Sequence, residues 1–346
     1  MYNREYEKKI RVGIVGVGSH LYRNLLPAIH HLPVQITAMC SRGQEKLQRT
    51  VDEYRCPAYP SAAEMYKNEK LDAAVISVSP GQHPDLVCEA LENGLHVFVE
   101  KPLAMSVGEV DRIIEVSSRV KKFVVVAYKK SFMPAADKAV EVINSEKYPG
   151  FCSMLACYPM TLPQNGAEVI EKRLFTNWLG NGCHPLSFML RIGGPVETLQ
   201  AITNEKGIGS VMLDFKNGVA GTFYLAGGPQ PNEEYHLHGS NWNLKIINSN
   251  RVILNRGIPF EYARTNNFVP PGEDSGSIVW EPQNCLATLE NKSLFIQGIV
   301  QEMMYFCQCV LNNEEPVRGS LGFARQITQL YEAALISSGK KIKINA

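Results

Sequence analysis

The segment "RVGIVGVGSHLYRNLLPAI", residues 11–29, runs from an apolar stretch through closely spaced glycines into a helix-forming stretch. Gly13, Gly16 and Gly18 fall at the turn, where backbone amides and a helix N-terminus can approach a pyrophosphate because no Cβ intervenes. Leu21 replaces the last glycine of the G-x-G-x-x-G pattern. Because the turn follows the first strand and opens a long α/β run, it predicts dinucleotide binding over an ordinary tight turn.

Outward from this turn, strands and helices alternate as far as about residue 130. The expected strands are 10–15, 35–40, 72–78, 95–99 and 123–127. These strands are apolar throughout, which is typical of strands that are buried on both faces. The pattern therefore predicts an α/β, Rossmann-type doubly wound parallel sheet.

Past about residue 150 strands follow one another with few helices between them. The expected strands are 151–158, 196–203, 208–215, 219–226, 233–239 and 242–247, with a hairpin turn at 216–218 and an irregular stretch at 256–292. This order predicts an open, mostly antiparallel sheet. Since 346 residues exceed what one core usually organises, we expect a Rossmann domain at 1–128 and a substrate-binding and oligomerisation domain at 129–346.

The overall charge is balanced, with 35 basic and 34 acidic residues. Such a chain has no field that would gather nucleic acid or acidic membranes, so neither partner is expected. No apolar run approaches the roughly 20 residues that span a bilayer. Nine scattered cysteines indicate a reducing compartment, and we expect a cytoplasmic protein. The C-x-C pair at 307 and 309 faces two directions of a helix, so no metal site is expected.

The residue that reads the adenosine ribose is expected roughly 20 residues after the glycine turn, at the tip of the second strand. The sequence there is "MCSRGQEKL", residues 39–47, without a carboxylate at the tip. Ser41 and Arg42 supply a hydroxyl and a guanidinium, which suit a 2′-phosphate. The cofactor is therefore predicted to be NADP in preference to NAD. The alternative is that Arg42 is solvated or stacks on the adenine.

Several further motifs follow in a fixed order along the chain. "SP" at 79–80 precedes His83, and "EKP" at 100–102 follows a strand. "AYKKSFMP" occupies 127–134, and a G-x-H occupies 182–184. Together with the glycine turn, these motifs resemble the glucose-fructose oxidoreductase, inositol dehydrogenase and rhizopine catabolism family (Gfo/Idh/MocA) over nearly the whole chain.

The resemblance implies nicotinamide-dependent oxidation or reduction of a secondary alcohol or ketone carbon of a sugar, polyol or sugar derivative. It also implies a homodimer or homotetramer formed through the open sheet, and it places the catalytic lysine at Lys101. The positions expected to bind the cofactor are Gly16, Gly18, Ser19, His20, Ser41, Arg42, Ser79, Pro80, His83, Glu100 and Lys101.

Lys101 has a physical reason to act in proton transfer. Oxidised nicotinamide is positively charged and disfavours a nearby ammonium, so the neutral amine is favoured and can exchange a proton with the reacting oxygen. The alternative is a lysine that extends from a loop into solvent and pairs with Glu100.

His184 is the second candidate for moving a proton, because an imidazole is a suitable base near neutral pH. The resemblance implies a carboxylate four residues earlier, yet that position is Gly180. Without it His184 should be a weaker base, and Lys101 should carry more of the proton transfer. Alternatively, Asn181 caps a helix that runs to Ile192, and His184 only fills its first turn.

Other polar and aromatic side chains are candidates for lining a substrate pocket, because such groups suit carbohydrates. They are Lys129, Tyr158, Arg173, Asn177, Trp178 and Asn181. Two other functions stay open. One is a lyase or glycosidase that oxidises and then reduces one carbon and keeps its cofactor. The other is a sensor that binds a nicotinamide nucleotide without catalysis.

Overall fold

The computed structural model describes residues 1–227, 232–257, 262–264, 276–283 and 288–345. The chain divides into two compact units. The first comprises Met1–Phe132 and Gly298–Gln329, and the second comprises Met133–Gln297 and Leu330–Ala346. The expected boundary after residue 128 lies close to the first change of unit. The grouping of 298–329 with the first unit was not expected, because no local pattern in the sequence signals a helix that returns.

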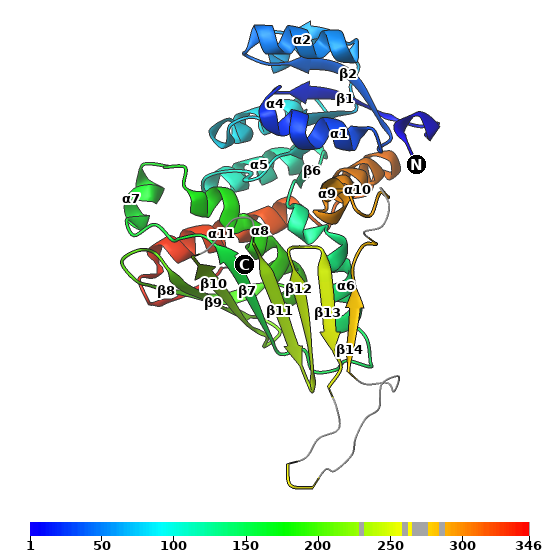
Figure 1. The fold of residues 1–346 in the computed structure, drawn as a ribbon. Helices are drawn as coiled ribbons and strands as arrows, with labels where there is room; N and C mark the ends of the chain where they lie inside the picture. Colours follow the sequence, from blue (N-terminus) through cyan, green and yellow to red (C-terminus); the bar gives the residue numbers. More distant parts are fainter. Residues whose placement is uncertain (228–231, 258–261, 265–275, 284–287, 346) are drawn as a thin grey trace. The chain divides into compact units, whose positions relative to one another are not determined.

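Parallel strands form the sheet of the first unit (Figure 1). Within the described residues the order is β3-β2-β1-β4-β5-β6. The strands are β1 (Ile10–Val15), β2 (Val34–Cys40), β3 (Ala58–Tyr59), β4 (Ala73–Ile76), β5 (His96–Val99) and β6 (Val124–Val126). β4, β5 and β6 are buried along their whole length. The prediction of a doubly wound parallel sheet is confirmed, and the two-residue strand β3 is an addition.

The helical segments of the first unit lie before, between and after these strands. They are η1 (Asn3–Glu5), η2 (Leu21–Leu25), α1 (Leu26–Ile29), α2 (Gln44–Tyr54), α3 (Ala62–Asn68), η3 (Pro80–Gln82), α4 (His83–Glu92), α5 (Val107–Val120), η4 (Lys129–Ser131) and α10 (Ile299–Asn312). Ser61 and Ser106 cap α3 and α5, each accepting a hydrogen bond from the backbone N–H three residues later. The helix α11 (Leu321–Ser337) contains the last change of unit.

The returning helix α10 packs against β1, β5, η4 and α1 of the first unit. Phe306 on α10 lies against Phe98 on β5, with ring centroids 5.7 Å apart. Tyr305 lies against Phe132 at 5.5 Å. These contacts explain why a segment from late in the chain belongs to the Rossmann unit.

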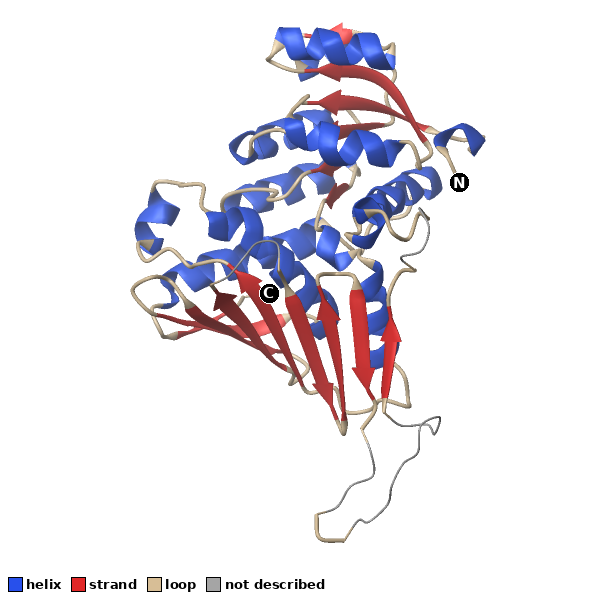
Figure 2. Cartoon of the chain, viewed as in Figure 1, coloured by secondary structure: helices blue, strands red, loops and turns tan. Residues whose placement is uncertain are grey.

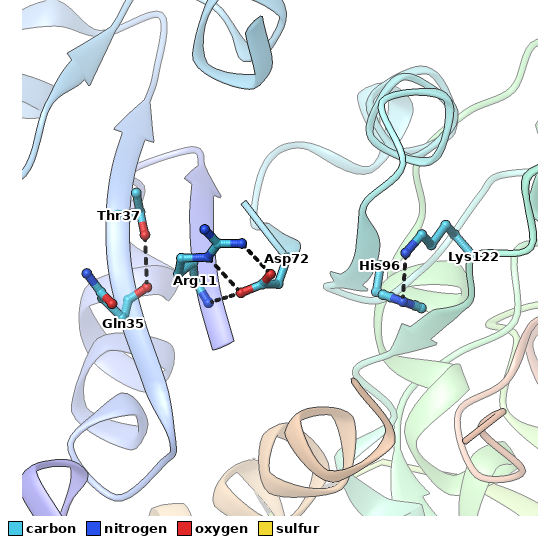
Figure 3. Close-up of polar contacts among 6 residues, drawn as sticks. All are labelled: Arg11, Gln35, Thr37, Asp72, His96 and Lys122. Carbon is cyan, nitrogen blue, oxygen red and sulfur yellow. Dashed lines mark hydrogen bonds and ion pairs between the residues drawn. The ribbon is translucent and has the colours of Figure 1, made fainter. Parts of the chain in front are cut away.

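Arg11 and Asp72 form an ion pair between neighbouring parallel strands (Figure 3). Arg11 donates from Nη2 to Oδ1 at 2.7 Å and from Nε to Oδ2 at 3.0 Å, and its backbone N–H also donates to Oδ2. The guanidinium holds the pKa of the Asp72 carboxyl below its ordinary value. In the same view His96 lies 3.2 Å from Lys122, and burial together with that lysine lowers the pKa of His96 to about 4.

The second unit is built on a mostly antiparallel sheet. Among the described residues its order is β14-β13-β12-β11-β7-β10-β9-β8-β15, and β7 with β10 is the parallel pair. The strands are β7 (Ser153–Pro159), β8 (Val196–Thr203), β9 (Gly209–Phe215), β10 (Ala220–Ala226), β11 (Glu234–Gly239), β12 (Trp242–Ile247), β13 (Arg251–Asn255), β14 (Ser277–Trp280) and β15 (Lys341–Lys343). The prediction of an open, mostly antiparallel sheet is confirmed.

The helices of the second unit include α6 (Pro134–Ile143), α7 (Gly166–Glu171), α8 (Asn177–Gly193) and α9 (Ser293–Ile296). α6 and α8 lie behind the strands in the view of Figures 1 and 2. In the structure α8 contacts β7 and β10, and α6 contacts β13. Burial alternates along β10, with Phe223 and Leu225 fully buried and Tyr224 44% exposed. One face of the strand therefore packs into the core and the other remains open.

Two predictions for the second unit need correction. The strands β13 and β14 were not expected, and β14 falls inside the stretch that was predicted to be irregular, 256–292. Much of that stretch lies outside the described residues. None of the helices in the described part of the chain combines the length and apolar character needed to cross a membrane.

We predict that Asp72→Asn lowers the free energy of unfolding at pH 7 by about 1 kcal/mol, because the partly exposed pair is two-pronged but screened by water. The pKa of Asp72 is lowered by folding, so this stabilisation is present above the ordinary aspartate pKa near ~4 and is lost as the pH falls through the lower folded-state pKa. Denaturant unfolding at pH 7 and in acid measures the difference.

The matched control is Asp85→Asn. Asp85 pairs with Arg112 and its side chain is 80% exposed, so its loss should change stability by less than about 0.5 kcal/mol. Equal effects of the two variants at pH 7 would contradict a special role for the Arg11–Asp72 pair.

Candidate cofactor and active site

A cavity of about 640 Å³ lies in the first unit, at the carboxyl ends of β1, β2 and β4. Ligands of open α/β sheets bind at this edge. The cavity is lined by seven of the positions expected to bind the cofactor: Gly16, Gly18, Ser19, His20, Ser41, Arg42 and Ser79. The structure thus brings together residues from three separate loops at one cavity, and their binding of the cofactor stays a prediction.

Gly16 is the position where the turn tolerates no side chain. Its φ is +96°, and a Cβ would lie 2.3 Å from the carbonyl oxygen of Ser77. At Gly18 a Cβ would meet nothing within 4 Å, so the space in front of that backbone is open. Helical structure begins at Ser19. This arrangement fits a pyrophosphate held by backbone amides at a helix N-terminus.

Leu21, which replaces the third glycine of the fingerprint, is fully buried. It begins the π-helical segment η2. A π turn is wider than an α turn. The wider turn leaves room for the Leu21 side chain at the position where the fingerprint has a glycine that lets the helix pack closely on the strand.

Basic side chains gather at the tip of β2. Ser41, Arg42 and Lys46 line the main cavity. A neighbouring hollow of about 500 Å³ is lined in part by Lys46, Arg23 and Arg49. Lys46 was not identified from the sequence, because a lysine in the first turn of an amphipathic helix is usually solvated. Because Lys46 lines the same cavity as Arg42, it supports the prediction that this loop binds the 2′-phosphate of NADP.

The remaining four expected cofactor residues do not line this cavity. His83 is fully buried, with Nδ1 2.8 Å from the oxygen of Pro102 and Nε2 3.1 Å from that of Val78. Burial lowers the pKa of His83. The prediction that His83 contacts the cofactor is therefore replaced: it braces the loop after β4 against the loop after β5. Pro80 begins η3, beside Ser79.

Glu100 links the glycine turn to the end of β5. Its Oε1 lies 2.8 Å from Nε2 of His20, and Glu100 is 8% exposed. Lys101 follows directly, half-buried, and precedes a cis bond to Pro102. The alternative of an Lys101–Glu100 pair stays open, because the contact with His20 uses one of the two carboxylate oxygens of Glu100.

A buried acid was missed. Glu302 on α10 is 2% exposed, and the charges that act on it include Glu100, Lys101 and Lys129. The signal in the sequence was one acidic residue inside an apolar helical face. Lys129, expected to meet substrate, lies in η4 of the same unit.

In the second unit His184 lies on α8, which begins five residues earlier than a cap at Asn181 would place it. Thr176 is the N-cap, and its Oγ1 accepts a hydrogen bond from the N–H of Leu179 at 3.2 Å. The alternative in which Asn181 caps this helix is not what the structure shows; Asn181 donates instead to the side chain of Asn177. His184 therefore lies in the second turn and is 6% exposed.

The position of the missing carboxylate is crowded by an aromatic ring. A Cβ on Gly180 would lie 2.7 Å from Cζ of Phe175. Phe175 is itself 59% exposed. An acidic side chain at 180 would require the end of this exposed ring to move.

The other substrate candidates of the second unit differ in burial and in the polar groups that they expose. Trp178 is 1% exposed, stacks on Phe223 and donates its indole N–H to the oxygen of Tyr331, so it is a core residue and not a pocket residue. Burial, followed by the charge of Glu233, raises the pKa of Tyr158 to about 12, which keeps its phenol neutral. Arg173 is exposed and has a left-handed backbone.

Lys101 belongs to the first unit and His184 to the second, so their meeting at a nicotinamide stays a prediction. Among the described residues, no group of three or more His, Cys, Asp or Glu side chains is arranged to hold a metal ion.

Known proteins are similar in sequence to the first unit of this chain and, in part, to the second. Residues 10–128 match the model of the oxidoreductase family with an NAD-binding Rossmann fold, GFO_IDH_MocA. The D-xylose 1-dehydrogenase (NADP(+)) 2 of Haloferax volcanii is 27% identical over 218 residues, covering 60% of this chain and 66% of the relative. A glycosyl hydrolase family 109 protein of Shewanella woodyi is 32% identical over 123 residues, 33% of this chain and 26% of the relative.

A solved structure supports the fold over the whole chain. An oxidoreductase from Agrobacterium radiobacter, crystallised with NAD+, L-tartaric acid and magnesium, superposes with a TM-score of 0.78. The two are 16% identical, and the match covers 97% of this chain and 98% of the other. Residues 10–128 are therefore similar to the NAD-binding Rossmann domain of the Gfo/Idh/MocA family of oxidoreductases.

Proposed function

We propose that this protein is an NADP-preferring oxidoreductase that transfers a hydride to or from a secondary alcohol or ketone carbon of a sugar, polyol or sugar derivative. The observation that carries the proposal is the link from the glycine turn through His20 and Glu100 to Lys101. It joins the cofactor cavity to an amine at the carboxyl edge of the same sheet. The xylose dehydrogenase and the other oxidoreductases similar to this chain support the reaction class.

A bound nicotinamide would supply the hydride chemistry. The residues of the chain supply binding and the proton. Gly18 and Ser19 present backbone amides to the pyrophosphate, while the N–H of Gly16 donates to the carbonyl oxygen of Cys40 at 2.9 Å and Gly16 serves by lacking a side chain. Arg42 and Lys46 line the same cavity and are assigned to the adenosine end. Lys101 takes the hydroxyl proton during oxidation and returns it during reduction. Glu100, held by His20, fixes the strand end that carries the lysine.

His184 is proposed as the second group that handles the proton. Phe175 fills the space beside Gly180, where a carboxylate would otherwise support an imidazolium. The proton transfer is therefore assigned mainly to Lys101. Lys129, Tyr158, Arg173 and Asn177 are the proposed substrate contacts; Trp178 is excluded by its place in the core.

We predict that Lys101→Met abolishes turnover while cofactor binding persists. A panel of aldoses, polyols and nucleotide sugars with NADP or NAD, followed by nicotinamide absorbance, measures the reaction. Loss of a positioned acid–base group should lower kcat by about 10²- to 10⁴-fold. Lys70→Met is the matched control because Lys70 is exposed. An active Lys101→Met enzyme would contradict the assigned role.

The relatives named glycosyl hydrolase family 109 proteins keep a second candidate open. An enzyme that oxidises and then reduces one carbon shows no net change in nicotinamide absorbance. It would retain tightly bound cofactor through purification and release a product detectable by mass spectrometry. Reversible nucleotide binding without turnover of any kind would point instead to a sensor.

We predict that Arg42→Ala and Lys46→Ala each weaken NADP binding by about tenfold or more and leave NAD binding nearly unchanged. Each substitution removes a charge-assisted hydrogen bond to the 2′-phosphate, and such bonds are worth about 1.5–3 kcal/mol. Thermal stabilisation by each nucleotide provides the measurement. A wild-type protein that is stabilised more by NAD than by NADP would contradict the preference.

The open face of the second sheet is the proposed site of a homodimer or homotetramer contact. Ile202, Ser210, Tyr224, Cys157 and Glu234 stand in one row across neighbouring strands. Ile202 is 52% exposed and Tyr224 44%. Exposed apolar side chains on a regular sheet face suit a self-complementary contact.

We predict that Tyr224→Lys shifts the protein toward the monomer, because it places like charges opposite one another across a two-fold contact. Light scattering coupled to size-exclusion chromatography gives the mass in solution. Tyr2→Lys, at a tyrosine that is 48% exposed in the first unit, should leave the mass unchanged. A monomeric wild-type protein would refute the proposed assembly.

A further inference from the structure

Glu302 on α10 is a buried acid that the proposed chemistry does not use. It is 2% exposed, and among the described residues its Oε2 atom finds no hydrogen-bond partner. A carboxylate in such a place would lose its hydration without full compensation. The residue therefore requires a specific physical account.

Packing places Glu302 beside the end of β5. Phe306 follows one turn later on the same face of α10 and contacts Phe98 on β5. Phe98 and Glu100 share one face of the extended chain, since side chains alternate along a strand. α10 also packs against η4, which carries Lys129. Glu302 thus belongs to the cluster that contains Glu100 and Lys101.

The charges around Glu302 oppose one another. Burial, and then the negative charge of Glu100, raises the pKa of Glu302 well above its ordinary value, while Lys129 and Lys101 act in the other direction. Burial is the largest of these effects, so the carboxyl keeps its proton near neutral pH.

Besides Lys129, η4 carries the buried Lys130. β5 carries His96, whose pKa is lowered to about 4, so it stays neutral. α1 contains no titratable residue, and Arg11 of β1 is paired with Asp72. Glu100 is held by His20 on its other side. Glu302, buried and with an Oε2 atom that finds no partner among the described residues, is therefore the acid in this cluster that keeps its proton.

We propose that Glu302 is a positioning residue for Lys101, holding one proton so that the Glu100–Glu302 pair presents a single negative charge to the lysine. This inference rests on the proposed role of Lys101 in proton transfer. Coupling between two sites is reciprocal: because a charged lysine favours ionised Glu302, ionised Glu302 would favour a charged lysine. A neutral Glu302 leaves Lys101 better able to give up its proton.

The first test asks whether Glu302 holds its proton. A carboxyl whose folded-state pKa is raised stabilises the fold less and less as the pH rises above the ordinary glutamate pKa of about 4.3. Glu302→Gln should therefore gain stability relative to the wild type as the pH rises, and Glu115→Gln, at an exposed position, should not. A Glu302→Gln protein that is less stable than the wild type at pH 8 would mean an ionised, lysine-paired Glu302 and would overturn the proposal. Glu302→Met replaces Glu302→Gln if that variant does not fold.

The second test reads Lys101 directly and needs no substrate. Competitive labelling with acetic anhydride, followed by mass spectrometry of the peptide that contains Lys101, gives its neutral fraction at each pH. As the pH rises above neutral, wild-type Glu302 loses its proton and adds a second negative charge beside the lysine. In Glu302→Gln that charge cannot develop, so the labelling midpoint of Lys101 should be lower than in the wild type by about one pH unit. Lys70 in the same samples should not move.

An unchanged midpoint for Lys101 would reduce Glu302 to a structural residue and overturn the positioning role. Because labelling proceeds without turnover, this result is distinct from a failure of the proposed reaction, which the substrate panel and Lys101→Met decide separately.

Discussion

The close approach of Gly16 to the carbonyl of Ser77 is the constraint on which the candidate site depends. The φ of Gly16 is +96°, and a Cβ at this position would lie 2.3 Å from that oxygen. Only glycine can therefore occupy the position where the chain leaves β1 and passes close to the end of β4. The turn opens a cavity along the ends of β1, β2 and β4. Because parallel strands end at one edge, loops far apart in sequence converge there. A dinucleotide cleft follows from this backbone path.

The chemistry depends on a second connection at the same edge. His20, in the glycine turn, holds Glu100, and Glu100 immediately precedes Lys101. His83 braces the neighbouring loops from within the core. A cofactor that orders the turn would therefore also order the strand end that carries the lysine. Glu302 extends this cluster into α10 and joins the C-terminal part of the chain to the nucleotide-binding unit.

Local patterns in the sequence were sufficient for the sheet of the first unit, for most strands of the second and for seven residues of the cleft. They failed where long-range packing decides. Nothing near Glu302 indicates that α10 returns to β5, and nothing near Trp178 shows that its indole is covered by the chain at Tyr331. The helix with His184 is capped by Thr176 and not by Asn181, and both residue types occur at N-caps, so the local sequence did not decide between them. The aromatic ring over Gly180 comes from a residue five positions earlier, in a loop without regular pattern.

A crystal structure of the protein with NADP and a substrate analogue would test the central claim most directly. The account predicts a pyrophosphate over Gly16 and Gly18, a 2′-phosphate beside Arg42, and Nζ of Lys101 within about 2.6–3.2 Å of the oxygen on the reacting carbon. A nicotinamide seated with Lys101 out of reach of that oxygen would contradict the assignment of the lysine and, with it, the proposed reaction.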